Sequence, residues 1–155
     1  MFKMSRVSYG GTAAVVTSMA LISGLGAADA TNAVIVSALL IAAFADNLTD
    51  SLSIHIFQES EQLDQMNAFT GTVTNFIARL LLCISFAHLI IITPIQDVAI
   101  VTILWGMLIL GIITYLIACE RKVKPAPEVI KHLLVASAVV LASNVTGHSI
   151  VSLLR

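Results

Sequence analysis

The sequence predicts an all-helical membrane protein with five transmembrane helices in a single domain. Of its 155 residues, 58% are hydrophobic and only 11% are charged, whereas about a quarter of the residues in a soluble domain carry a charge. Five stretches stay apolar over about 20 residues, the length that a helix needs to cross the hydrocarbon core of a bilayer. Residues 1–155 are long enough for one helical bundle and too short for two.

Local signals set the ends of the expected helices. The second is expected to begin at the cap residues Thr-Asn at 31–32. The third is expected to stop before Pro94, and Pro125 and Pro127 are expected to interrupt the last loop. Nothing breaks the second helix before about Met66, so it is expected to project into the cytoplasm. The predicted spans are about 10–28, 32–57, 69–93, 97–118 and 128–153.

Basic residues determine the expected orientation. Lys3 and Arg6 precede the first span, and a second basic cluster lies between the fourth and fifth spans. Because basic loops stay on the cytoplasmic side, the N-terminus is expected inside and the C-terminus outside. The short loops favour a prokaryotic inner membrane. Residues 28–30 (Ala-Asp-Ala) also resemble a signal-peptidase site, but the apolar run before them is longer than that of a signal peptide, which favours a permanent helix.

Composition and motifs exclude several functional classes. The net charge of −1 provides no basic field for nucleic acid. The sequence contains no nucleophile–base constellation, P-loop or HExxH motif, so we expect neither an enzyme nor a bound organic cofactor. The two cysteines show no metal-binding or disulfide spacing.

The second span carries two aspartates, Asp46 and Asp50, at membrane depth. Intramembrane carboxylates are costly and usually mark a path for a cation or a proton. Residues four apart face the same side of a helix, and Thr49 and Ser53 lie within about 60° of Asp46 on that side. Oxygen ligands suit Mg²⁺, Mn²⁺ and Fe²⁺, and neighbouring carboxylates also attract protons. These four residues are the candidate ion-binding site.

Other polar residues extend this candidate path towards both sides of the membrane. Glu61 and Asp64 continue the same helix face, and Glu59 lies close by in the sequence. These three acids are expected to attract cations at the cytoplasmic mouth. Asn144 and His148 share a face of the fifth span and are candidates for an exit path. Hydrogen bonding between helices is the alternative role for this pair.

Arg79 in the third span supports a competing interpretation. It lies about ten residues, or ~15 Å, from the cytoplasmic end of its helix, at a depth similar to that of the two aspartates. A buried Arg–Asp pair would join the second and third helices and leave one aspartate free. Arg79 is therefore expected to be a charge partner, either as a purely structural link or as a group that tunes or displaces the ion.

Short motifs resemble the vacuolar iron transporter (nodulin-like) family. Residues 45–53 (Ala-Asp-Asn-Leu-Thr-Asp-Ser-Leu-Ser) are similar to the family's Ala-Asp-Gly-Leu-Ser-Met-Ala-Leu-Gly run, and residues 58–61 are similar to its Lys-Ser-Glu tail. Residues 23–25 resemble its Ala-Gly-Val segment. Residues 75–78, in a helix that ends at Pro94, resemble its Thr-Phe-x-x-Phe helix.

This resemblance implies a homodimer that exports Fe²⁺ or Mn²⁺ from the cytoplasm in exchange for protons. In that family the first helices of both subunits flank the path. Small residues in the first span would allow their close approach, although packing within one subunit is an alternative use; they are Gly10, Gly11, Ser23, Gly24 and Gly26.

The sequence departs from the family in its metal ligands. The family's first-helix aspartate aligns near residues 12–14, where no carboxylate exists, its second-helix methionine aligns with Asp50, and a family glutamate aligns with Ile54. Its cytoplasmic metal-collecting helices are replaced by about ten residues. These differences permit Mn²⁺ or another hard divalent cation, and they leave open a relative that has lost transport.

The leading hypothesis is therefore a homodimeric membrane protein that exchanges a divalent cation for protons, with lipid as its surroundings and the metal as substrate. One alternative is a non-transporting assembly or regulatory subunit that contains a structural Asp–Arg pair. Another is a small channel for protons or monovalent cations.

Overall fold

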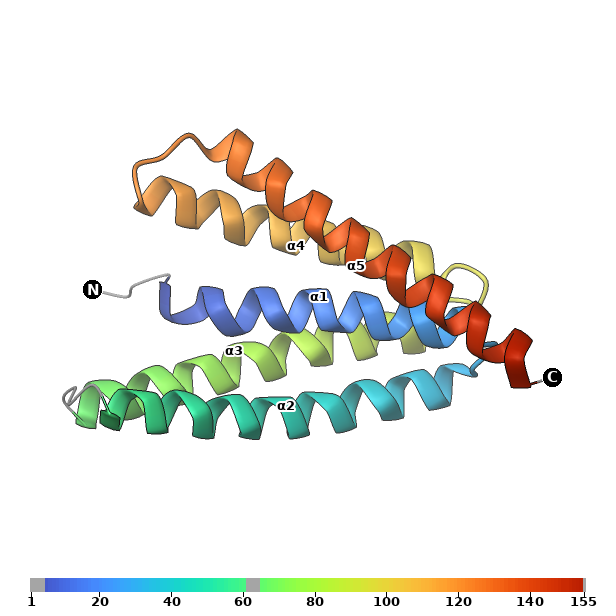
Figure 1. The fold of residues 1–155 in the computed structure, drawn as a ribbon, viewed down its shortest axis with the longest axis horizontal. Helices are drawn as coiled ribbons and strands as arrows, with labels where there is room; N and C mark the ends of the chain where they lie inside the picture. Colours follow the sequence, from blue (N-terminus) through green and yellow to red (C-terminus); the bar gives the residue numbers. More distant parts are fainter. Residues whose placement is uncertain (1–4, 61–64, 155) are drawn as a thin grey trace.

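The structure, a computed structural model, describes the backbone of residues 5–60 and 65–154 and the side chains of 10–50, 52–53, 56–57 and 72–154. The described residues form five helices (Figure 1): α1 (Ser5–Ala27), α2 (Asn32–Ser60), α3 (Gln65–Ile92), α4 (Val98–Glu120) and α5 (Pro125–Leu154). Each contains a stretch long and apolar enough to cross a membrane. The predicted class, an all-helical protein with five membrane-length helices, is confirmed, while the orientation stays a prediction.

Most helix ends fall within three residues of the predicted span ends, but α1 begins at Ser5 and α3 at Gln65, earlier than the predicted starts at 10 and 69. A hydroxyl cap opens α2, where the Val34 backbone N–H donates to Thr31 Oγ1 at 3.4 Å. The described part of α2 ends at Ser60 and α3 begins at Gln65, so Met66 belongs to the third helix and the expected continuation of the second helix to Met66 is wrong. No proline or glycine marks this connection in the sequence. α5 begins on Pro125 rather than at 128, because proline lacks only an N–H that the first helical turn leaves unbonded anyway.

α1 occupies the centre of the bundle and contacts each of the other four helices (Figure 1). One side of α1 packs against the α4–α5 hairpin and the other against α3, with α2 at the edge of the molecule. Met19 of α1, Phe86 of α3 and Leu110 of α4 are buried in the main hydrophobic core. An apolar side chain gains nothing on moving from lipid to protein, so close packing rather than water exclusion holds such helices together.

Small residues let the backbones of α1 and α5 approach closely. A Cβ atom added to Gly147 of α5 would overlap the carbonyl oxygen of Gly24 in α1. At the other end of α1, a Cβ atom on Gly10 would overlap the amide oxygen of Asn75 in α3. Gly10 and Gly24 therefore serve contacts within the chain, the alternative weighed for the small residues of the first span. A Cβ atom on Gly26 would meet nothing within 4 Å.

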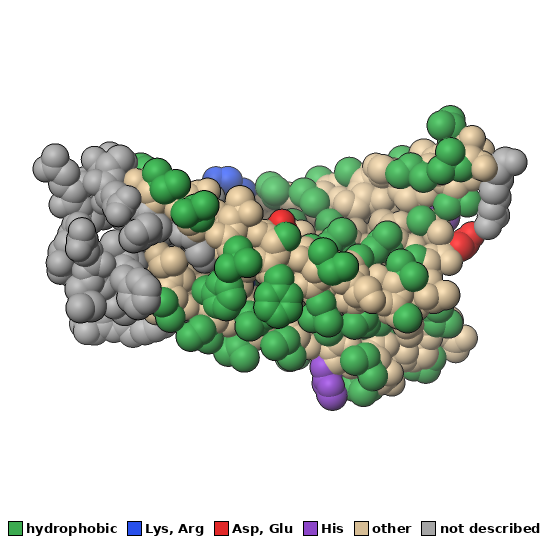
Figure 2. Space-filling model, turned by 90° about the horizontal axis from the view of Figure 1, so that it is seen from below, with side chains coloured by type: hydrophobic (Ala, Val, Ile, Leu, Met, Phe, Trp, Pro, Cys, Tyr) green, Lys and Arg blue, Asp and Glu red, His purple; other side chains and the backbone are tan. Residues whose placement is uncertain are grey.

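The outer surface of the bundle is largely apolar, as a lipid-facing surface must be. α2 packs chiefly against α3 and leaves large side chains exposed on its other sides, among them Ile41, Phe44, Leu48 and Leu52. Figure 2 views the molecule from the side of α2 and α3 and shows many hydrophobic side chains among the backbone and other side chains, with acidic side-chain atoms visible midway along.

Candidate functional site

The two intramembrane aspartates lie on α2 in different surroundings. Asp50 forms an ion pair with Arg79 of α3, whose Nη1 donates to Asp50 Oδ2. Arg79 is only 5% exposed, so its side chain is buried where α3 packs against α2. A charged side chain at this depth needs a partner of opposite sign. The structure therefore assigns the charge partner to Asp50, one helical turn beyond Asp46.

Asp46 is exposed, and its carboxylate makes no ion pair or hydrogen bond with the described residues. It lines a cavity of about 10 Å³ between α1, α2 and α3. Ser18 of α1 and Cys83 of α3, whose Oγ and Sγ atoms are 3.8 Å apart, line the same cavity together with Arg79. A cavity of this size holds about one water-sized particle. Its walls provide hydroxyl, thiol and carboxylate groups, but also a guanidinium that repels cations.

Thr49 and Ser53 are exposed on α2 and do not line this cavity. The Thr49 hydroxyl donates to the Ala45 carbonyl of its own helix at 2.9 Å. A hydroxyl oxygen that donates its hydrogen in this way keeps lone pairs for a cation. Thr49 and Ser53 therefore lie outside the cavity, whose lining includes Asp46 and its neighbours from α1 and α3.

The predicted entry and exit residues are only partly described. Glu61, Asp64 and the side chain of Glu59 lie outside the described part of the chain. On α5, Asn144 donates through Nδ2 to Ser23 Oγ of α1 at 3.3 Å. This bond ties α5 to α1, the alternative weighed for the pair, whereas His148 is exposed.

Two buried asparagines beside the charged groups were not assigned to the site from sequence. Asn47, 1% exposed, donates through Nδ2 to the Phe76 carbonyl of α3 at 2.9 Å, and its Oδ1 has no partner among the described residues. Asn75, 2% exposed, lies one turn before Arg79, and neither of its amide atoms has a partner in the described structure. Asn47 follows Asp46 directly and therefore points about 100° away from it around α2, towards α3. This angular offset is the sequence signal that could have placed Asn47 at the contact with α3.

Among the described residues, Arg79 pairs with only one of the two aspartates, Asp50, and Asp46 has no basic partner. Over the described residues, no three histidine, cysteine, aspartate or glutamate side chains come together as a metal site. A divalent cation would therefore require ligands from beyond this group, such as a second copy of the chain or water.

Comparisons with protein-family models, with curated proteins and with solved structures found no match for this chain. The resemblance to the vacuolar iron transporter family therefore rests on the short motifs alone.

Proposed function

We propose that this membrane protein binds a divalent cation, Fe²⁺ or Mn²⁺, through Asp46 and carries it out of the cytoplasm in exchange for protons. The observation that supports this proposal is the carboxylate of Asp46, which lies in a membrane-length helix, lines a small cavity and has no ion-pair partner among the described residues. A group of this kind costs about 3 kcal/mol or more in a bilayer. A bound cation or proton would offset that cost. Asp50, paired with Arg79, takes a structural role instead.

The proposed transporter is a homodimer in which α2 contributes to the contact between subunits. The glycines at 10 and 24 are already used inside the chain, whereas much of α2 is exposed. A two-fold axis near Asp46 would bring together two uncompensated carboxylates, whose combined charge matches one divalent cation. Thr49 and Ser53, also exposed on α2, would supply further oxygen ligands at that contact.

Proton exchange follows from the same carboxylates in this proposal. Two acids held close together bind protons more readily than an isolated acid does, so protons from the far side would displace the metal there. Glu59, Glu61 and Asp64 would collect cations at the cytoplasmic end, in the orientation that the basic loops favour.

The test is Mn²⁺ and Fe²⁺ uptake into liposomes that contain the full chain. We expect Asp46→Asn to lower the initial rate at least tenfold (about 1.4 kcal/mol in the barrier) without loss of folded protein. Asp97→Asn is the matched control, because Asp97 is an exposed aspartate beyond the spans. Normal uptake by Asp46→Asn would rule out this carboxylate as the ion site.

A second candidate is a non-transporting membrane subunit, and the Asp50–Arg79 ion pair favours it, because an ion pair with a buried arginine can hold two helices together. This candidate predicts that calorimetry detects no Mn²⁺ binding to the wild-type chain. A proton or monovalent-cation channel would instead produce a conductance in liposomes without any divalent metal. The same reconstituted sample distinguishes all three.

A further inference from the structure

A larger pocket lies away from the aspartates, at the end of the bundle where α4 leads into α5. It has a volume of about 230 Å³ and is enclosed by α1, α4 and α5. Thr12 lies near the start of the first apolar span, Arg121 just beyond the fourth, and Glu128 and His132 near the start of the fifth. The pocket therefore sits at the level where hydrocarbon gives way to lipid headgroups.

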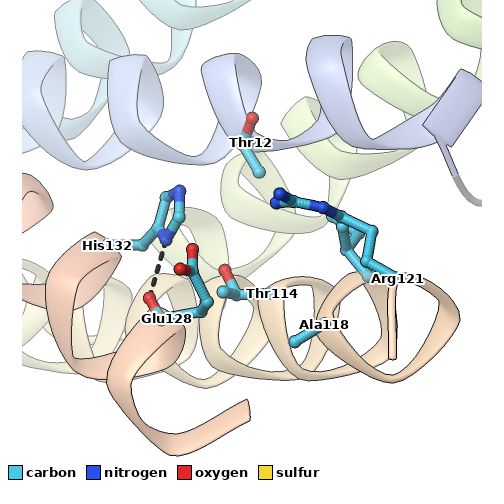
Figure 3. A pocket seen from close by; sticks show the side chains of 7 residues that line it. Thr12, Thr114, Ala118, Arg121, Glu128 and His132 are labelled. Atoms are coloured by element: carbon cyan, nitrogen blue, oxygen red, sulfur yellow. Dashed lines mark hydrogen bonds between the residues drawn. The ribbon is translucent and has the colours of Figure 1, made fainter. Parts of the chain in front are cut away.

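Opposite charges enter this pocket from two sides (Figure 3). The guanidinium of Arg121 extends into it from the end of α4, and the carboxylate of Glu128 extends into it from the first turn of α5. No ion pair joins these two side chains in the described structure. The dipole of α5 also stabilises the Glu128 carboxylate in its first turn. That local interaction does not require an arginine on the opposite side of the pocket. The pocket thus has one positive and one negative side.

His132 adds a hydrogen-bonding group beside Glu128 (Figure 3). Its Nδ1 is 2.7 Å from the backbone carbonyl oxygen of Glu128. A carbonyl only accepts, so Nδ1 carries the hydrogen, and in the neutral ring Nε2 is left as an acceptor. The carboxylate and Nε2 are both suited to receive N–H donors. Ile117 and Ala118 of α4 form an apolar part of the wall.

A ligand that carries only one sign of charge would meet repulsion on one side of this pocket. A phosphate alone would face Glu128, and an amine alone would face Arg121. A molecule with a phosphate and a primary ammonium a short distance apart satisfies both sides, because guanidinium groups bind phosphate well and ammonium N–H groups suit the carboxylate and Nε2. At this level of a membrane, that combination is the headgroup of an aminophospholipid.

We propose that the pocket between α1, α4 and α5 binds the headgroup of a zwitterionic aminophospholipid. Arg121 holds its phosphate, and Glu128 and His132 hold its ammonium. The bound lipid bridges the end of the α4–α5 hairpin to α1. This proposal does not depend on cation transport, because none of these residues belongs to the Asp46 site.

The test measures lipid binding to the full chain purified in detergent, by thermal-shift titration or native mass spectrometry. The three lipids have identical acyl chains: phosphatidylethanolamine with a primary ammonium, phosphatidylcholine with a methylated one, and phosphatidylglycerol with none. We expect phosphatidylethanolamine to bind at least about tenfold more tightly than either of the others, the difference of one or two charge-assisted hydrogen bonds. Equal binding of phosphatidylglycerol would overturn the proposal. This comparison needs no substitution, so it holds even where a variant fails to fold.

Two pocket variants locate the binding. Arg121→Gln and Glu128→Gln are each expected to weaken phosphatidylethanolamine binding about tenfold. Their controls make the same chemical change at exposed positions that do not line the pocket, Lys124→Gln and Glu120→Gln. Equal effects of the pocket and control variants would overturn the site. Soluble phosphoethanolamine, added without lipid, separates the two sources of this headgroup: if it binds as tightly as the lipid, the ligand is a free zwitterion and the lipid assignment is wrong.

Discussion

Two pairs of helices are held together by different interactions. One pair is α1 and α5, and the other is α2 and α3. α1 and α5 meet through glycines that bring the backbones together, supported by a neutral hydrogen bond from Asn144 to Ser23. α2 and α3 meet through an ion pair and a buried asparagine. Since two membrane helices can associate without any charge, the charges of α2 and α3 are not explained by packing alone. That difference is the structural reason to seek function at α2 and α3.

The strongest way to break the α2–α3 contact is to remove one member of its ion pair. Arg79→Met leaves Asp50 as an uncompensated charge and is expected to lower the free energy of unfolding by about 3 kcal/mol. Detergent-titrated unfolding in micelles measures this change. The double variant Arg79→Met/Asp50→Asn removes both charges and is expected to recover most of the loss. A double variant no more stable than Arg79→Met would show that the guanidinium acts through packing rather than through Asp50.

The α1–α5 contact is tested through backbone proximity instead of charge. Gly147→Ala would place a Cβ atom against the Gly24 carbonyl, which as backbone cannot move aside, so the helices must separate. We expect a loss of about 2 kcal/mol in unfolding free energy. The control is Gly26→Ala in α1, where the added Cβ meets nothing within 4 Å. The same unfolding assay should show no loss for that control, and equal losses for the two variants would contradict the close approach.

A smaller effect is expected from the two buried asparagines of the α2–α3 region. Asn47→Ala removes a hydrogen bond to the Phe76 carbonyl, whereas Asn75→Ala removes an amide that has no partner among the described residues. Asn47→Ala is therefore expected to destabilise the chain by about 1 kcal/mol more than Asn75→Ala. The difference between their unfolding free energies is the quantity to measure. A larger loss of unfolding free energy for Asn75→Ala than for Asn47→Ala would mean that Asn75 is hydrogen-bonded in the membrane-embedded protein.

The smallest expected effect belongs to the neutral bond between α5 and α1. Asn144→Ala removes the donor to Ser23 and is expected to cost about 0.6 kcal/mol, the average for a hydrogen bond between membrane helices. Ser149→Ala is the control, because the Ser149 hydroxyl bonds only within α5, to Val145. A loss for Asn144→Ala as large as that for Arg79→Met would erase the distinction between the neutral and the charged contact.

Helix number and approximate helix ends could be predicted because they depend on local properties. The length of an apolar segment determines whether it can span a membrane. Pro94 and the capping residue Thr31 each affect only the adjacent turn, where a helix ends or begins. The start of α5 was missed because proline was treated as a helix breaker, although its first-turn position is compatible with a helix.

The pairing of helices could not be predicted, because several faces of each helix are apolar and periodicity does not choose between them. The position of α1 at the centre depends on glycines in α1 and α5 that lie far apart in the sequence. The choice of Asp50 rather than Asp46 for Arg79 depends on how far α2 slides along α3, a shift of about one turn, or ~5 Å. The pocket between α1, α4 and α5 could not be predicted for a similar reason: Thr12 is remote in sequence from Arg121 and Glu128.

The central place of α1 also has a consequence for biogenesis. α1 is synthesised before the other four described helices and is the least hydropathic of the five spans, yet α5, whose Gly147 packs against Gly24 of α1, is synthesised after those other helices. Until α5 is made, Gly24 lacks the Gly147 backbone that packs against it. The contact between α1 and α5 can therefore form only after the other described helices have been synthesised.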